Sequence, residues 1–390
     1  MKTIIVLLSI AFFTQTFAQP VPDLLIQAGA GAAEVWNDSI YFFGGSDRWG
    51  GAVLYPRIYK YNGNTWRYYD SIPDNNMWDV KSVIVEDDVY LLSGWRSGYR
   101  LIRKYNLSDR EWTYLNNGPN PETYGTTAEY VAGFIYHFNR SGNVYEYDIA
   151  NDIWTTKIPN IIPGYDLSSI VYQNEIYIIG FYDSTFFKYS PATNTWTQLA
   201  KTIYPISGCS MNVLDGFIYC AGGSPQGNPS EQRNTLLVYN IQENSWHEDE
   251  FRLMNSKIMM ADVIYRGEIY LLGGFDSSSA AVNTVERIIP TGPVSSINES
   301  VIPSDFMLYQ NYPNPFNPAT TIKYMIKTPA HVKLSIYNLL GENIVELADE
   351  YKYPGSYEIK FDASNLSGGM YFIRLKAGTF TSTKKCLLLK

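Results

Sequence analysis

The sequence has few of the residues that build reactive centres. Histidine and cysteine each occur only three times in 390 residues, and charged residues make up 17% of the chain. The histidines, His137, His247 and His331, lie far apart, whereas a metal site or a nucleophilic triad needs side chains that converge. The sequence therefore predicts no metal, no cofactor and no histidine-dependent triad.

The N-terminal apolar run, from Ile4 to Phe13, is shorter than the roughly 20 residues that a membrane-spanning helix needs. It follows Lys2 and precedes Thr16-Phe17-Ala18, an arrangement typical of a secretory signal peptide. We therefore expect residues 1–18 to be removed on export and the mature chain to begin at Gln19.

Positive charge is also scarce, with 30 Lys and Arg against 38 Asp and Glu, a net charge of −8. Binding to phosphate backbones relies on Lys and Arg laid along the nucleic acid, and the sequence has no basic run. Nucleic acid is therefore not an expected partner.

The cysteines of an exported chain invite the question of disulfides, and three of them cannot all pair internally. Cys209 and Cys220 flank an Asp215-Gly216 turn, which places Met211 opposite Cys220 and leaves Cys209 diagonal, about 7–8 Å away. Because that separation is too long for an easy disulfide, we predict buried free thiols.

Aromatic residues, by contrast, are abundant: they make up 15% of the chain, 33 of them Tyr, alongside 29 Gly and 20 Pro. This composition favours strands joined by tight turns. A unit of 41 to 51 residues recurs six times within residues 21–290, each with a hydrophobic-Tyr pair: Ile40-Tyr41, Val89-Tyr90, Ile135-Tyr136, Ile176-Tyr177, Ile218-Tyr219 and Ile269-Tyr270. Such a period with strand-like content indicates propeller blades.

Each unit divides into four predicted strands. The second strand often ends in paired glycines, at Gly44-Gly45, Gly222-Gly223 and Gly273-Gly274. The third ends in Tyr and the fourth opens with Trp, in the pairs Tyr61 and Trp66, Tyr105 and Trp112, Tyr147 and Trp154, Tyr189 and Trp196, Tyr239 and Trp246. These Trp residues are expected to pack between blades.

The double glycine followed by Tyr and then Trp resembles the kelch repeat, over about 270 residues. The resemblance implies a six-bladed kelch-type β-propeller, in a superfamily that includes galactose oxidase. Two units depart from the pattern, with Asn139-Arg140 and Gly180-Phe181 in place of paired glycines. The scattered histidines argue against the copper chemistry of galactose oxidase.

The ring also needs to close. No Trp strand follows the sixth unit, whereas an extended segment, Pro22–Gln27, precedes the first unit. We predict that this N-terminal segment supplies the outer strand of the last blade, because pairing the chain's ends removes a free sheet edge.

In a four-stranded blade, the loops between the second and third strands and those between blades lie on one face. Here these loops are long and varied, as ligand-binding loops usually are. Aromatic planes and guanidinium groups suit sugar rings or an extended chain. The predicted binding residues on this long-loop face are Arg48, Trp49, Trp78, Trp95, Arg96, Tyr99, Tyr124 and Tyr165. The alternative is that these aromatics pack over the blades.

The same face carries acidic residues, so a carbohydrate-active hydrolase or isomerase is the alternative function. The six carboxylates expected there are Asp47, Asp74, Asp79, Glu122, Asp166 and Asp183. Acidic residues in loops usually form turns or contact solvent. We therefore expect binding without catalysis, with a pair of converging carboxylates as the feature that would favour an enzyme.

After a polar linker at residues 291–304, residues 305–390 alternate in strand fashion and predict a small Ig-like β-sandwich. The sequence of this region resembles the type A C-terminal sorting domain of type IX secretion. The residues that carry this resemblance are Tyr312, Pro313, Asn314, Pro315, Phe316, Asn317 and Pro318, with Gly341, Gly355, Gly369 and Lys385. An adhesive sandwich module is the alternative.

The sorting resemblance implies a Gram-negative cell, export across the outer membrane by the type IX machinery, and attachment to the cell surface. Together with residues 19–290, it predicts an all-β protein in which a monomeric propeller binds an extracellular glycan or protein.

Overall fold

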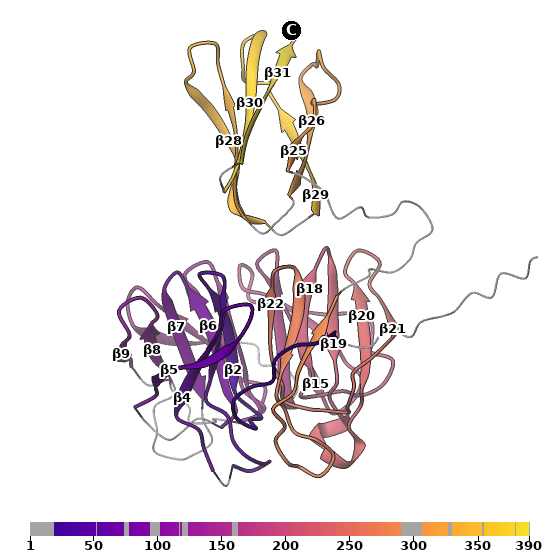
Figure 1. The fold of residues 1–390 in the computed structure, drawn as a ribbon. Coiled ribbons are helices and arrows are strands. Elements are labelled where there is room, and N and C mark those ends of the chain that lie inside the picture. The colour runs from indigo at the N-terminus through magenta and orange to yellow at the C-terminus, as the bar shows by residue number, and fades with distance from the viewer. Residues whose placement is uncertain are drawn as a thin grey trace, which may run out of the picture. The chain divides into compact units, whose positions relative to one another are not determined.

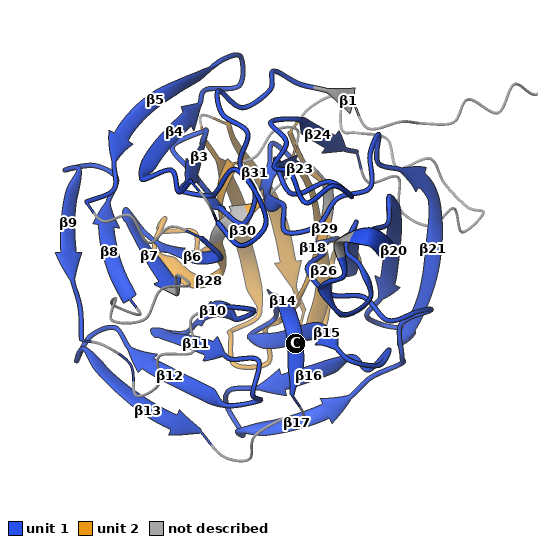
Figure 2. Ribbon diagram, turned by 90° about the horizontal axis from the view of Figure 1, so that it is seen from below, with its two compact units in different colours: residues 1–292 blue, residues 293–390 orange. Residues whose placement is uncertain are grey.

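The computed structural model describes residues 19–51, 53–73, 78–93, 102–116, 118, 124–157, 163–289, 306–326, 330–352, 355–378 and 380–389. The chain divides into two compact units, Met1–Gly292 and Pro293–Lys390 (Figure 2). Strands dominate both units (Figure 1), which confirms the predicted all-β propeller class. No helix among the described residues has the length and apolarity to cross a membrane.

The described strands of unit 1 form six four-stranded antiparallel sheets arranged in a ring (Figure 2). The strands of the first three sheets are β2 (Ala32–Trp36), β3 (Ser39–Phe43), β4 (Arg57–Tyr61), β5 (Trp66–Ser71), β6 (Val80–Val85), β7 (Asp88–Ser93), β8 (Ile102–Asn106), β9 (Glu111–Tyr114), β10 (Thr127–Val131), β11 (Phe134–Phe138), β12 (Val144–Asp148) and β13 (Ile153–Lys157). Each sheet is one blade, and the strand that faces the axis is β2, β6 or β10 in these three blades.

The remaining blades follow the same order. Their strands are β14 (Gly164–Tyr172), β15 (Glu175–Phe181), β16 (Phe187–Ser190), β17 (Thr195–Gln198), β18 (Ser210–Leu214), β19 (Phe217–Ala221), β20 (Thr235–Asn240), β21 (Ser245–Arg252), β22 (Ala261–Tyr265), β23 (Glu268–Leu272) and β24 (Val285–Ile288). Two short 3-10 helices, η1 (Pro225–Gly227) and η2 (Pro229–Glu231), lie in the loop between β19 and β20. The innermost strands of neighbouring blades touch all round the ring, including β2 with β22.

The Tyr and Trp of each repeat face each other across the two outer strands. Tyr105 pairs with Trp112 and Tyr239 with Trp246 in the sheet register, and their ring centroids are 4.7 and 5.0 Å apart. The indole N–H then reaches the preceding blade, as where Trp246 donates to the carbonyl of Ala200 at 3.0 Å. The repeat residues thus join strands within a blade and blades to each other.

The glycine pairs stand where chains crowd. Gly273 has a φ of +62°, and a Cβ atom there would lie 2.0 Å from the carbonyl oxygen of Ala28. A larger residue at this position would push the sixth blade off the first.

The N-terminal segment closes the last blade, as predicted, but its pairing differs. The strand is β1 (Gln19–Pro20), which pairs with β24, and not Pro22–Gln27. Pro22 instead accepts the indole hydrogen bond of Trp66 at 2.9 Å, the bond that other Trp residues make to a preceding blade. Pro22 has no N–H to donate, which limits regular pairing beyond β1.

The prediction about the cysteines is confirmed. Met211 faces Cys220, and all three cysteines are free and buried.

Unit 2 has a three-stranded sheet, β25-β26-β29, and a four-stranded sheet, β28-β27-β30-β31, around one core. Their strands are β25 (Met307–Leu308), β26 (Ala319–Ile326), β27 (Ala330–Tyr337), β28 (Asn343–Lys352), β29 (Gly355–Asp362), β30 (Gly369–Ala377) and β31 (Phe380–Leu388).

Closure can be tested with two neighbouring leucines. Leu24 is 2% exposed and packs with Val263 and Val285 of the last blade, whereas Leu25 is 57% exposed. Leu24→Ala should lower the free energy of unfolding by about 2–5 kcal/mol because it leaves a cavity. Leu25→Ala should leave it almost unchanged. Equal melting temperatures for the two variants would refute the closure.

Candidate functional site

The long-loop face is organised by a circle of six residues around the axis. One residue in each blade, at the entrance to its innermost strand, has a left-handed φ between 45° and 64°. The six equivalent residues are Ala30, Asp79, Gly125, Asp166, Gly208 and Met259. Left-handed φ is costly for residues other than Gly, Asn and Asp, so this geometry needs support from its surroundings.

The support is a closed set of hydrogen bonds between blades. Three residues of the circle donate their N–H to the carbonyl of the preceding blade at 2.8–2.9 Å: Ala30 to Met259, Met259 to Gly208, and Gly208 to Asp166. The other links are Val80 to Ala30 and Leu167 to Gly125, both at 3.3 Å, and the N–H of Gly125 to the carboxylate of Asp79. Every pair of neighbouring blades is therefore joined at this face.

Asp79 and Asp166 are the two carboxylates of this circle. Both are buried, and burial together with the negative charge of Asp79 raises the pKa of Asp166 to about 7. Asp79 accepts the N–H of Gly125 and lies 3.4 Å from the ammonium group of Lys81. Asp166 lies under Gly227 of η1, where an added Cβ would come within 2.3 Å of its Oδ2.

Polar side chains line the innermost strands farther along the axis, and they come in pairs that bridge two blades. Glu34 bonds to Ser82, Ser169 donates to Glu129 at 2.7 Å, and Asn212 donates to Asp262 at 2.7 Å. Burial is the main cause of the raised pKa values of the three acids, about 7 for Glu34, 8 for Glu129 and 7 for Asp262. The pKa of Glu129 also rises because of the charges of the other two.

An aromatic cluster lies beside this axis on the long-loop face. Trp49 packs edge-on against Trp78 and Phe275, with ring centroids 6.1 and 5.6 Å apart. Trp78 and Phe275 are buried, whereas Trp49 is half-buried. The loops that carry Trp49 and Phe275 are tied together, since the N–H of Trp49 donates to Ser279 at 2.9 Å.

Tyr124 joins this cluster to a second group. Tyr124 packs against the aromatic cluster, and its ring carries the guanidinium of Arg140 at 4.0 Å from the centroid. Tyr165 is also half-buried, and burial raises its pKa, with smaller effects from Asp166 and Tyr124. Trp49, Tyr124 and Tyr165 are thus half-buried on this face, and the guanidinium of Arg140 lies over the ring of Tyr124.

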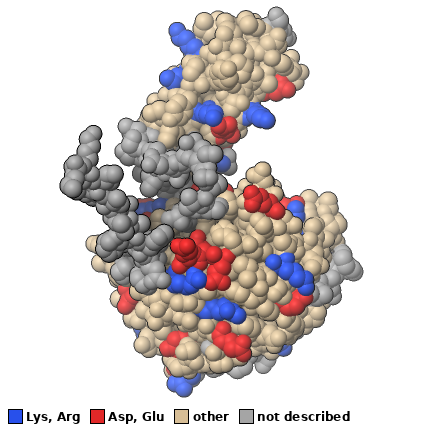
Figure 3. Space-filling model, turned by 90° about the vertical axis from the view of Figure 1, so that its right-hand side faces the viewer, with Lys and Arg blue, Asp and Glu red and all other residues tan. Residues whose placement is uncertain are grey.

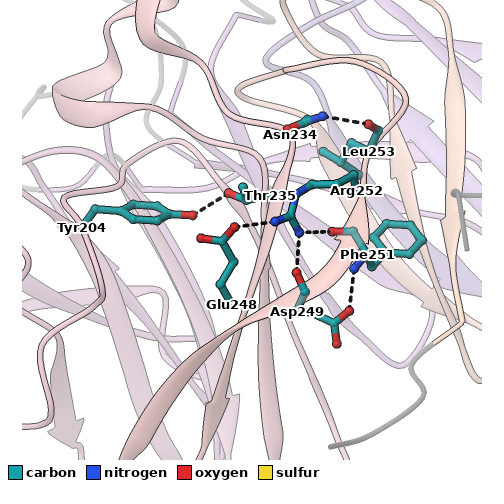
Figure 4. A network of polar contacts seen from close by, with 8 residues as sticks. All are labelled: Tyr204, Asn234, Thr235, Glu248, Asp249, Phe251, Arg252 and Leu253. Carbon is teal, nitrogen blue, oxygen red and sulfur yellow. Dashed lines mark hydrogen bonds and ion pairs between the residues drawn. The ribbon is translucent and has the colours of Figure 1, made fainter. Parts of the chain in front are cut away.

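The loop from β19 to β20, which packs against one edge of the Tyr165 ring, is anchored at its base (Figure 4). The hydroxyls of Tyr204 and Thr235 bond at 2.6 Å, and the Asn234 amide donates to the carbonyl of Leu253 at 3.3 Å. Beside them Arg252 donates to Glu248 at 2.6 Å and holds the irregular end of β21. The loop that packs against Asp166 and one edge of Tyr165 is therefore held to the body of the fifth blade.

The structure sorts the predicted binding residues into three groups. Arg48, Trp49, Tyr124 and Tyr165 reach the surface of the long-loop face. Trp78 is buried and supports Trp49, which for this residue favours the alternative of packing over the blades. Trp95, Arg96 and Tyr99 lie outside the described residues, as do the carboxylates Asp74 and Glu122.

Sequence reasoning missed Phe275, Arg140 and the acids around the axis. The acids had a signal: when the repeats are aligned on their hydrophobic-Tyr pairs, Glu34, Glu129 and Asn212 occupy one column, two blades apart. Arg140 and Phe275 stand in loops that differ from blade to blade, so no repeat pattern identifies them.

Metal ligation has no support among the described residues, where no group of three or more His, Cys, Asp or Glu side chains could hold an ion. His137 is buried beside Tyr145 and Trp154, and burial lowers its pKa to about 4. Acidic and basic side chains lie interspersed on the face of unit 1 in Figure 3.

Comparison with known proteins covers both units. Residues 310–389 match the family described as the secretion system C-terminal sorting domain. Kelch-like protein 35 of Mus musculus is 25% identical over 170 residues, which are 41% of this chain and 29% of the relative. Kelch-like protein terF of Aspergillus terreus is 23% identical over 317 residues, 72% of this chain and 68% of the relative.

The solved structure of YjhT aligns with a TM-score of 0.58 and 12% identity, over 70% of this chain and 98% of that one. This likeness shows the fold. The protein is a kelch-type propeller with a type IX sorting domain. The sorting domain indicates secretion through the type IX system, for which attachment to the cell surface is typical. The chain spans less than a third of the length of Kelch-like protein 35.

The buried acids around the axis of the kelch-type propeller should make its stability depend on pH. Because the folded-state pKa values of Glu34, Glu129 and Asp262 exceed those of the unfolded chain, the folded state holds more protons between about pH 4 and 8. Stability should therefore fall as pH rises through this window. Glu129→Gln, which mimics the protonated acid, should melt several degrees higher than the parent at pH 8 and nearly equally at pH 4.

The matched control is Glu111→Gln on β9, where the side chain is exposed. This control should follow the parent at every pH. A Glu129→Gln variant with the parent's pH profile would contradict the proposed protonation of Glu129.

Proposed function

We propose that the propeller is a non-catalytic binding module outside the cell and takes an extracellular glycan or protein on its long-loop face. The observation that carries the proposal is the set of three half-buried aromatic residues on this face, Trp49, Tyr124 and Tyr165. The guanidinium of Arg140 lies over the ring of Tyr124, and Arg48 is exposed next to Trp49 in the chain. Flat rings next to planar donors can stack on a sugar or a peptide and hydrogen-bond its polar edges.

The support beneath these rings favours binding because it holds them in place. Trp49 rests on the buried Trp78 and Phe275, and the loops of the first and last blades share backbone hydrogen bonds. A surface that is already ordered loses little conformational entropy when a ligand arrives. The support beneath Trp49 is therefore consistent with a binding role for this ring.

The enzyme alternative depends on Asp79 and Asp166, the buried carboxylates of the circle. Asp79 is occupied by the N–H of Gly125 and by Lys81, and Asp166 lies beneath Gly227. A catalytic carboxylate must come within hydrogen-bond reach of its substrate. Their burial supports a role in joining blades. The acids around the axis, Glu34, Glu129 and Asp262, each bond to a side chain of a neighbouring blade, which supports the same structural role for them, so we favour binding over catalysis.

Two substitutions on the face test the proposal. Trp49→Ala and Tyr165→Ala should each weaken binding to the ligand identified on a glycan array or a panel of extracellular proteins by about tenfold or more, because each removes a contact ring. Affinity is measured by calorimetry on the purified full-length chain. Tyr68→Ala, on the exposed surface of the outer strand β5, is the control. Parental affinity in both face variants would refute the proposal.

The sorting domain gives a separate prediction. A chain truncated after residue 304 loses unit 2, whose hydrophobic core contains no residue of unit 1. In a cell with a type IX system, the truncated propeller should accumulate in the periplasm. Cell fractionation and immunoblotting provide the measurement, and surface display of the truncated chain at the parental level would argue against sorting by unit 2.

A further inference from the structure

Three sequence motifs of unit 2 that are far apart in the chain meet at one end of its sheets. Tyr337, at the end of β27, pairs with Phe372 of β30, which in turn pairs with Lys385 of β31. Phe316, in the Pro-rich segment of residues 312–318, forms a bridge with Leu388 of β31. The turn after β27, the Pro-rich segment and the C-terminal residues therefore lie at the same end of the two sheets. Figure 1 shows the strands of unit 2.

Residues of the Pro-rich segment, together with Gln310 just before it, hold this end together. The side chains of Gln310 and Asn314 both donate to the carbonyl of Lys385, at 2.7 and 3.2 Å, and Asn314 also accepts the N–H of Leu387 at 2.9 Å. The backbone of Phe316 exchanges hydrogen bonds with Leu387 and Leu389. These bonds cover the otherwise free edge of β31.

Apolar side chains gather on the surface of the same end. Leu339 and Leu340 are 68% and 83% exposed in the turn between β27 and β28. Further residues of this end that expose more than a third of their surface are Tyr312, Met370, Leu387 and Leu389. Exposed apolar residues gathered in this way usually mark an interaction site.

The turn is built to present its two leucines. The side-chain oxygen of Asn338 accepts the N–H groups of Leu340 and Glu342 at 2.9 and 3.0 Å, and its amide donates to the Glu342 carboxylate at 2.6 Å. The Asn338 N–H donates to the carbonyl of Glu342 at 3.1 Å, and Gly341 takes a φ of +79°. A turn fixed by this many bonds keeps both leucines in solvent.

We propose that the Leu339–Leu340 turn is the contact by which an outer-membrane component of the type IX machinery holds this domain, with both leucines in an apolar pocket of that component. The surface lies in unit 2 and concerns export alone, so the proposal is independent of ligand binding by the propeller. The match to a sorting domain requires such a partner, and the turn is the most exposed apolar pair at the end where the motifs meet.

The chemistry favours a protein pocket over a lipid surface. Lipid binding at an interface grows with buried apolar area and with attraction of basic residues to anionic headgroups. The turn offers two leucines directly beside the acidic Glu342, which is a small apolar area with the wrong charge. Two adjacent branched side chains on a rigid tip suit a concave apolar pocket.

The test uses the full chain in a cell with a type IX system. The double variant Leu339→Ser, Leu340→Ser should appear on the surface at least tenfold less than the parent and accumulate in the periplasm. Its melting temperature should match the parent's, because both side chains are exposed. Met307→Ser is the control, since Met307 is exposed on β25 and pairs with Met325 near the opposite end of the sheet. Parental export of the double variant overturns the proposal.

A second measurement avoids any dependence on folding of the double variant. Leu340 is replaced by the photo-crosslinking residue p-benzoylphenylalanine, and the crosslinked product is identified by mass spectrometry. A product with an outer-membrane component of the type IX system supports the proposal. A product with a second copy of this chain, with lipid or with any other protein overturns it.

Discussion

Hydrogen bonds between blades at the circle of left-handed residues join all six blades of unit 1, and the long-loop face is built on this circle. An innermost strand has no partner on the side of the axis, so its backbone groups must find partners in neighbouring blades or in solvent. The circle satisfies them, with Asp79 supplying a carboxylate where a carbonyl would otherwise stand. Because the loops between blades end at this circle, its geometry also places Tyr124 and Tyr165, which directly precede Gly125 and Asp166.

Around the axis the chemistry repeats every two blades, although the backbone repeats every blade. Odd blades supply Glu34, Glu129 and Asn212, and the following even blades supply their partners Ser82, Ser169 and Asp262. Side chains of a strand alternate between the two faces of its sheet, so a position facing the next blade meets a neighbouring register there. Each bond therefore needs complementary residues in two neighbouring blades. In this chain the two kinds of residue alternate from blade to blade, which gives the two-blade period.

The repeat pattern predicts the fold well because it reports short-range constraints. The Tyr and Trp pairs, the glycine pairs and the turn that sets Met211 opposite Cys220 all depend on local register. The closure was predicted in kind but misplaced, since Trp66 uses Pro22 as an acceptor and leaves pairing to Gln19–Pro20.

The binding face was predicted less completely because burial there depends on contacts between distant loops. Trp78 and Trp49 look alike in sequence, yet only Trp78 is fully covered, by residues that include Phe275 from the last blade. Arg140 gains its place from Tyr124, which belongs to the loop before its own blade. Such contacts join loops that differ in length and sequence from blade to blade, so the repeat pattern does not predict them.

The sorting domain shows how a motif can be specific without being the surface that a partner touches. Within the Pro-rich segment, Asn314 and Phe316 are spent on the edge of β31, and Asn311 bonds to Thr320 inside the domain. Edge protection explains these residues, because an uncovered β31 would pair with other chains during passage through the periplasm. Leu339 and Leu340 are instead exposed, in a turn that the side chain of Asn338 fixes, which fits the recognition role proposed for them.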